Sequence, residues 1–147
     1  MSPDKKLISA IDLSVTFKVP SGSLRAVDTV SFYVNAGETV AIVGESGSGK
    51  TTLALSLMRA YAPTSGNLFF EDQDITHLSE KALKDFRKKV QMVFQDPFAS
   101  LNPRLTVYAT LAEPLLVHGI VPPGQVPGRV ARLMEQVGLA PRFMQKY

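Results

Sequence analysis

The sequence contains 147 residues, of which 45% are apolar and 20% are charged, and its formal net charge is +3. This balance is typical of soluble globular proteins, and a chain of this length can form a core without a disulfide or a metal. The absence of cysteine excludes disulfides, thiolate nucleophiles and cysteine-ligated metal sites. Neither His77 nor His118 has a partner at metal-ligand spacing, so we do not expect a histidine metal site.

Membranes and nucleic acids are also poorly supported as direct ligands. The longest apolar run, near residues 40–43, is far shorter than the roughly 20 residues needed to cross a bilayer. Residues 1–6 include Asp4 and lead into an alternating pattern, so no secretory signal is expected. The positive charge is mild and dispersed, which gives little reason to expect nucleic acid or anionic lipid.

The N-terminal part predicts an antiparallel hairpin. Apolar and polar residues alternate over residues 7–17, which is typical of a half-buried strand. Pro20 and Gly22 mark a turn, and the period of two returns at Val30, Phe32 and Val34. A third run, residues 39–43, is a short continuous run of β-branched and apolar residues, which predicts a strand buried on both faces of a parallel sheet.

A phosphate-binding loop follows this third run. Residues 44–51 read Gly-Glu-Ser-Gly-Ser-Gly-Lys-Thr and match the P-loop pattern at every fixed position. A helix predicted over residues 52–60 gives the motif its required context. The other reading is a glycine-rich turn with an exposed lysine. On the P-loop reading, we expect the phosphate-binding residues to be Gly44, Ser46, Gly47, Ser48, Gly49, Lys50, Thr51 and Thr52.

The chemistry of a nucleotide requires these residue types. Phosphate oxygens are met by successive backbone N–H groups, which need glycines for close approach. The N-terminus of the helix adds a partial positive charge, and Lys50 adds a full charge toward the β- and γ-phosphates. Thr51 is expected to offer its hydroxyl oxygen to Mg²⁺. The sequence therefore predicts a nucleotide site without fixing how the nucleotide is used.

Further along, residues 67–70 and 90–94 are predicted strands, and residues 79–89 form an amphipathic helical pattern between them. The lysines of that helix form either a solvated face or a nucleic-acid patch. We favour the solvated face and predict no nucleic-acid partner, because no aromatic residues interleave with the lysines.

The motifs together resemble the ATP-binding subunit of ABC transporters, in particular the dipeptide and oligopeptide import subfamily. The resemblance covers nearly the whole chain and depends on residues 26–28, residues 43–52 and, most specifically, residues 93–104, Val-Phe-Gln-Asp-Pro-Phe-Ala-Ser-Leu-Asn-Pro-Arg. It implies an α/β fold, a P-loop NTPase core of ABC type with an N-terminal antiparallel β subdomain and a partial helical subdomain. It also implies that Gln95 approaches Mg²⁺ and the attacking water, as a catalytic residue with Lys50, and that Phe17 stacks on adenine. Read alone, Gln95 would be an ordinary polar residue at the end of a strand.

The same resemblance implies the organisation and partners of the protein. Residues 1–97 would be the ATP-binding core and residues 98–147 the start of the helical subdomain. ATP and Mg²⁺ would be the cofactors, and the partners would be transmembrane permease subunits, a second ATP-binding subunit and, indirectly, a solute-binding protein. The location implied is the cytoplasmic, inner face of the cell membrane. The transported solute cannot be read from this chain.

The last part of the sequence predicts two helices. Residues 107–115 carry an apolar stripe that Pro114 should end or kink, residues 122–127 have a linker composition, and residues 130–137 carry a second stripe closed by Gly138. The resemblance assigns this region to contact with the membrane-spanning partner, although both stripes could equally be ordinary core faces.

Family members continue into a Ser-Gly-Gly-Gln signature, the Walker B carboxylates and a switch histidine, which these 147 residues do not contain. We therefore expect a truncated domain that binds ATP with little or no turnover. A non-catalytic nucleotide-binding or interaction fragment is the alternative. A small-molecule kinase is a third class, but neither an arginine-rich lid nor an acceptor site can be identified.

Overall fold

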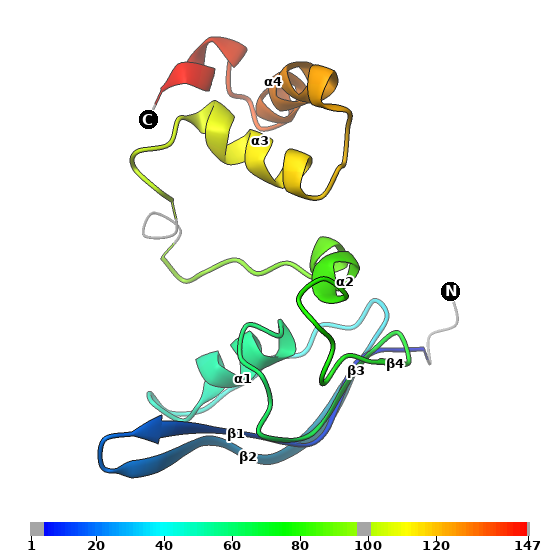
Figure 1. The fold of residues 1–147 in the computed structure, drawn as a ribbon, viewed down its shortest axis with the longest axis vertical. Coiled ribbons are helices and arrows are strands. Elements are labelled where there is room, and N and C mark those ends of the chain that lie inside the picture. Colours follow the sequence, from blue (N-terminus) through cyan, green and yellow to red (C-terminus); the bar gives the residue numbers. More distant parts are fainter. Residues whose placement is uncertain (1–4, 97–100, 147) are drawn as a thin grey trace. The chain divides into compact units, whose positions relative to one another are not determined.

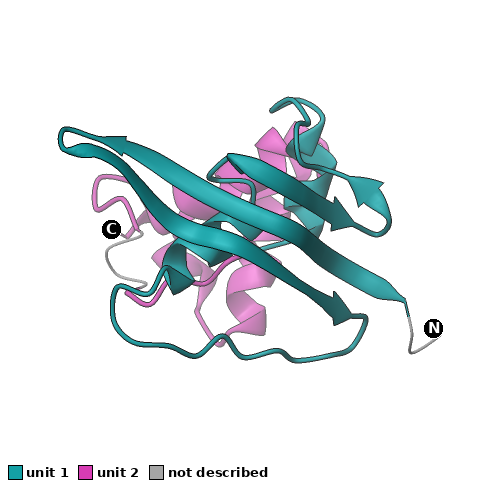
Figure 2. Cartoon of the chain, turned by 90° about the horizontal axis from the view of Figure 1, so that it is seen from below, with its two compact units in different colours: residues 1–91 teal, residues 92–147 magenta. Residues whose placement is uncertain are grey.

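The computed structural model describes residues 5–96 and 101–146. The chain divides into two compact units, residues 1–91 and residues 92–147 (Figure 2). The predicted division of the chain into an ATP-binding core, residues 1–97, and the start of a helical subdomain, residues 98–147, stays a prediction. No helix among the described residues is long and apolar enough to span a membrane.

The first unit is built on a four-stranded antiparallel sheet. Its strands are β1 (Lys6–Val19), β2 (Gly22–Asn35), β3 (Ser65–Phe70) and β4 (Gln73–Asp74), and their order in the sheet is β2-β1-β3-β4. Val19 pairs with Gly22 across a tight turn, so the predicted hairpin is confirmed. The strand predicted at residues 67–70 is confirmed as part of β3.

Two helices cover the same face of this sheet (Figure 1): α1 (Lys50–Leu57) and α2 (Leu83–Lys89). Their apolar side chains share one core with the sheet. The rings of Phe70 and Phe86 meet edge to face at 5.1 Å within it. The buried apolar residues of this core are Ala10, Leu13, Val15, Val27, Leu53, Leu68, Phe70, Ile75, Leu83 and Phe86.

Two predicted strands are wrong. Residues 39–43 and residues 90–94 form no strand in the structure. Val43, which was expected to be buried, is 90% exposed, and Val93 is 91% exposed. An apolar, β-branched run forms a central strand only where neighbouring strands accept its backbone hydrogen bonds, and within residues 5–96 and 101–146 neither run has such a neighbour.

The second unit is helical. It contains α3 (Val107–Val117), the short 3₁₀ helix η1 (Pro123–Gln125), α4 (Val126–Gln136) and a second 3₁₀ helix η2 (Pro141–Gln145). The two predicted helices are confirmed. They pack around a small apolar core that consists of Ala112, Leu115, Val126, Val130 and Met134.

The ends of these helices correct two predictions made from proline. Pro114 was expected to end or kink α3; an end at Pro114 is wrong, because the helix continues to Val117, and a kink stays a prediction. Residues 122–127 are not a linker, because they form η1 and the first turn of α4, where a proline needs no N–H partner. Gly138 does close α4 as predicted: its φ is +76°, and the N–H of Leu139 reaches back to the carbonyl of Met134 at 2.9 Å.

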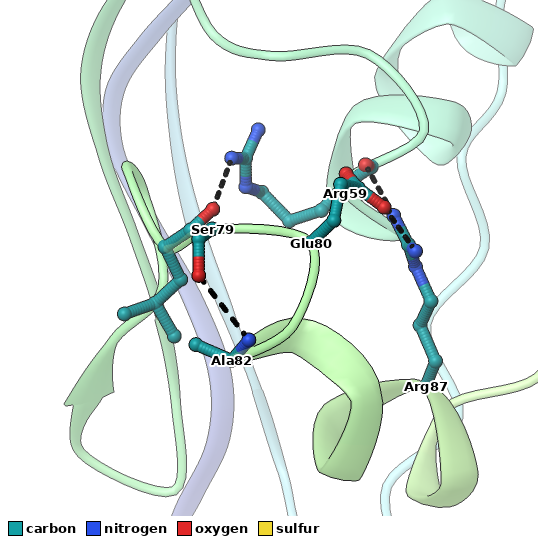
Figure 3. A network of polar contacts seen from close by, with 6 residues as sticks. Arg59, Ser79, Glu80, Ala82 and Arg87 are labelled. Carbon is teal, nitrogen blue, oxygen red and sulfur yellow. Dashed lines mark hydrogen bonds and ion pairs between the residues drawn. The ribbon is translucent and has the colours of Figure 1, made fainter.

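The C-terminal end of α1 is fixed by a buried arginine (Figure 3). Arg59 has a positive φ of +54°, which lets the N–H of Ala60 bond to the carbonyl of Leu55. Its guanidinium donates to the carbonyl oxygens of Ile75 at 2.9 Å and Leu78 at 3.5 Å. Burial lowers the pKa of Arg59. The side chain thus joins α1 to the segment that leads into α2.

A surface ion pair lies beside this arginine. Arg87 donates to both carboxylate oxygens of Glu80 and to the carbonyl of Arg59. The hydrogen bond from Arg87 lowers the pKa of Glu80, so this contact is complete above the ordinary value of 4.5 and is lost as the pH falls through the lowered pKa. Both side chains are substantially exposed, so the pair contributes little to stability.

Arg59→Met should destabilise the first unit, because it leaves two partly buried carbonyl groups without their donor. The expected loss in the free energy of unfolding is about 1–3 kcal/mol, measured by urea denaturation. Arg87→Met is the matched control and should lose no more than about 1 kcal/mol. Equal stability of Arg59→Met and the unsubstituted chain would contradict this role.

Candidate nucleotide-binding site

A pocket of about 530 Å³ lies between the P-loop and the β1–β2 hairpin. Every residue that lines it belongs to the first unit. The P-loop side is the start of α1 and the turn before it, and the hairpin side consists of residues close to the tip of the hairpin. The lining residues are Phe17, Leu24, Arg25, Ala26, Gly47, Ser48, Gly49, Lys50, Thr51 and Thr52.

The backbone of the P-loop touches β2 directly. Gly49 caps the start of α1 with φ +90°. A Cβ atom at this position would lie 2.1 Å from the carbonyl oxygen of Ala26, which is too close for any side chain to fit. Glycine is therefore required here twice, for the positive φ and for the close approach to the strand.

Four backbone N–H groups of residues that line the pocket are unpaired within the part of the chain that the structure describes. Among the hydrogen bonds of residues 5–96, the backbone N–H groups of Gly47, Gly49, Lys50 and Thr51 have no acceptor. No side chain caps α1. Free N–H groups at the start of a helix, together with the positive end of the helix dipole, suit an anion such as a phosphate.

The side chain of Lys50 folds back onto the P-loop that precedes it. Its Nζ donates to the carbonyl oxygens of Gly44 at 2.8 Å and Glu45 at 2.6 Å, and it lies 3.5 Å from Oγ of Ser48. The ammonium group is therefore already held at the phosphate-binding turn by neutral acceptors. A phosphate oxygen is a stronger partner for this ammonium than a neutral carbonyl.

The remaining predicted residues divide into three groups. Thr51, an exposed residue in the first turn of α1, and Thr52 line the pocket, and their roles toward phosphate and Mg²⁺ stay predictions. Gly44 contributes its carbonyl to Lys50 without lining the pocket, and Ser46 lies in the turn outside the lining. Gln95 belongs to the second unit and is exposed, so its role toward Mg²⁺ stays a prediction.

Phe17 forms the apolar end of the pocket. It lies near the end of β1, opposite Leu24 of β2, and its ring meets that of Tyr61 edge to face at 5.2 Å. Tyr61 therefore supports the ring of Phe17 from outside the pocket lining. The sequence reasoning missed Leu24, Arg25 and Tyr61. The register of the hairpin would have indicated Leu24, because it pairs with Phe17.

Known proteins are similar to this chain over most of its length. The family model described as ABC transporter matches residues 27–146. The oligopeptide transport ATP-binding protein AppF of Bacillus subtilis is 47% identical over 132 residues, which cover 89% of this chain and 40% of the relative. The di/tripeptide transport ATP-binding protein DppF of Pseudomonas aeruginosa is 42% identical, over 96% of this chain and 46% of the relative. The chain thus spans less than half the length of these relatives.

Solved structures show the same fold. The ATP-binding cassette MJ0796, in a dimeric post-hydrolysis state bound to ADP and Pi, aligns with a TM-score of 0.77 and 26% identity, over 94% of this chain and 60% of that one. The cbiO1 component of Clostridium perfringens aligns with a TM-score of 0.69 at 24% identity, over 97% of this chain and 54% of that one. The predicted fold class, a P-loop core with an antiparallel β subdomain and a partial helical subdomain, is confirmed.

Gly49→Ala should separate the P-loop from β2, because the added methyl group would overlap the carbonyl of Ala26. Gly37→Ala is the matched control: Gly37 also has a positive φ, +81°, but nothing lies within 4 Å of its Cβ position. Urea denaturation should show a loss of about 1 kcal/mol for Gly37→Ala and at least about 2 kcal/mol for Gly49→Ala. Equal losses would mean that the close approach does not matter for stability.

Proposed function

The chain belongs to the ABC transporter family, and from this premise we propose that it is the ATP-binding part of an importer of peptides or similar solutes. ATP binding and hydrolysis in the complete protein would drive the import. The observation that carries the proposal is the pocket in which free N–H groups, Lys50 and an aromatic ring lie together. The named functions of the relatives in peptide transport support the class of solute.

In the proposed complex, the P-loop holds the phosphates. The free N–H groups of Gly47, Gly49, Lys50 and Thr51 donate to phosphate oxygens. Lys50 also exchanges its carbonyl acceptors for the β- and γ-phosphates. Phe17 offers its ring face to adenine. Aromatic stacking of this kind contributes about 1–3 kcal/mol and tolerates any base, so selectivity for adenine should be modest.

The residues of the site fit a magnesium ion bound with the nucleotide. Thr51 has an exposed hydroxyl in the first turn of α1, beside the phosphate-binding turn, and a hydroxyl oxygen is a ligand that Mg²⁺ accepts. When bound, the ion would neutralise charge on the phosphates. Gln95 is proposed as the second contact of the ion and as the group that orients the attacking water.

The partners proposed for the complete protein are transmembrane permease subunits, a second ATP-binding subunit and, through the permease, a solute-binding protein. The dimeric state of the MJ0796 cassette supports the second ATP-binding subunit. The peripheral position on the inner face of the membrane follows from these partners. The helical second unit would provide contacts with the permease.

A second candidate function is nucleotide binding without catalysis. One observation favours it for these 147 residues taken alone: the described residues that line the pocket include no Asp or Glu that could polarise an attacking water. Both candidates share the nucleotide site and differ only in turnover.

Lys50→Ala tests the nucleotide site. The variant should bind Mg-ATP about 10- to 150-fold more weakly than the unsubstituted chain, because one charge-assisted hydrogen bond of about 1.5–3 kcal/mol is lost. Isothermal titration calorimetry measures the two affinities. Lys84→Ala, which removes an exposed lysine of α2, is the matched control and should bind as the unsubstituted chain does. Equal affinity of Lys50→Ala and the control would exclude the site.

A phosphate-release assay separates the two candidate functions. The purified, monodisperse 147-residue chain should release phosphate from Mg-ATP at the background rate, because none of the described residues that line the pocket carries a carboxylate. Lys50→Ala serves as the control for contaminating ATPases. Turnover well above background that disappears in Lys50→Ala would show that the chain contains a catalytic base and would exclude the non-catalytic candidate.

A further inference from the structure

The pocket is lined by a second cationic side chain, that of Arg25, in addition to Lys50. Arg25 is on β2, directly before Ala26, whose carbonyl abuts the P-loop at Gly49. In the hairpin register it pairs with Thr16, next to the pair formed by Phe17 and Leu24. Arg25 therefore lies where the phosphate-binding turn and the aromatic end of the pocket meet. Of the described residues that line the pocket, Arg25 and Lys50 are the cationic ones.

Arg25 forms an exposed ion pair with Asp28 that can be broken at little cost in stability. Its Nη1 donates to Oδ1 of Asp28 at 3.0 Å, and the two side chains are 62% and 59% exposed. Exposed ion pairs of this kind contribute little to stability. Asp28 also accepts a hydrogen bond from the hydroxyl of Thr29 at 2.9 Å, so its carboxylate keeps a partner if the guanidinium moves away. The Thr29 hydrogen bond, with a further contribution from Arg25, lowers the pKa of Asp28.

We propose that Arg25 is a nucleotide-binding residue that exchanges Asp28 for the polyphosphate of the bound nucleotide. A guanidinium group presents paired donors that match two phosphate oxygens, whereas an adenine ring offers it no comparable charge. Lys50 holds the end of the polyphosphate at the P-loop, and Arg25 holds it from the hairpin side. This inference depends on the proposed function, since it assigns one more residue to the same site.

Calorimetry of the 147-residue chain with Mg-ATP tests this assignment. Arg25→Gln should weaken binding about three- to tenfold, and Arg25→Lys, which keeps the charge, should restore most of the loss. The affinity of the unsubstituted chain should also fall more steeply with added salt than that of Arg25→Gln. Lys18→Gln removes a charge from the same hairpin without touching the pocket lining, and it should change the affinity less than about twofold.

Asp28→Asn distinguishes a binding role from a structural one. Arg25→Gln and Asp28→Asn both break the same ion pair, so a purely structural pair predicts equal losses of ATP affinity. The proposal predicts that Asp28→Asn binds ATP as tightly as the unsubstituted chain or more tightly, because Arg25 is released. Equal losses, or unchanged binding by Arg25→Gln while Lys50→Ala is impaired, would overturn the role of Arg25 and leave the proposed function standing. Unchanged binding by Lys50→Ala would overturn both.

Discussion

The contact between the P-loop and β2 is the constraint on which the candidate site depends. Gly49 brings the start of α1 against the carbonyl of Ala26, and a side chain at that position has no room. This contact places the free N–H groups of the loop beside the hairpin, so that one pocket has a phosphate-binding side and an aromatic side. The pocket would not have this form if either the left-handed backbone of Gly49 or the hairpin were changed.

The rest of the first unit stabilises the two partners of this contact. The hairpin belongs to a sheet whose buried face packs against α1 and α2. At the opposite end of α1 from the P-loop, Arg59 joins the helix to the segment before α2 through two backbone carbonyls. The helix that presents the phosphate-binding turn is therefore held by the sheet along its side and by a buried guanidinium at its C-terminal end.

The sequence predicted the features that depend on local backbone chemistry. Alternating residues and a turn predicted the hairpin, and the spacing of glycines and Lys50 predicted the P-loop. It failed where a feature depends on distant partners. Residues 39–43 have the composition of a central strand and residues 90–94 that of a strand, yet a strand exists only where another strand accepts its hydrogen bonds. Arg25 could not be assigned to the site from the P-loop motif, because the hairpin register is what brings it to the pocket.

The central claim, that this one pocket binds the nucleotide, is tested most directly by an NMR titration of the ¹⁵N-labelled 147-residue chain with Mg-ATP. The largest changes in amide chemical shift should occur at residues 47–52 of the P-loop and at residues 24–26 of β2. Ring-proton shifts of Phe17 should accompany them. Changes confined to residues 101–146, or no changes at residues 47–52 at saturating Mg-ATP, would contradict it.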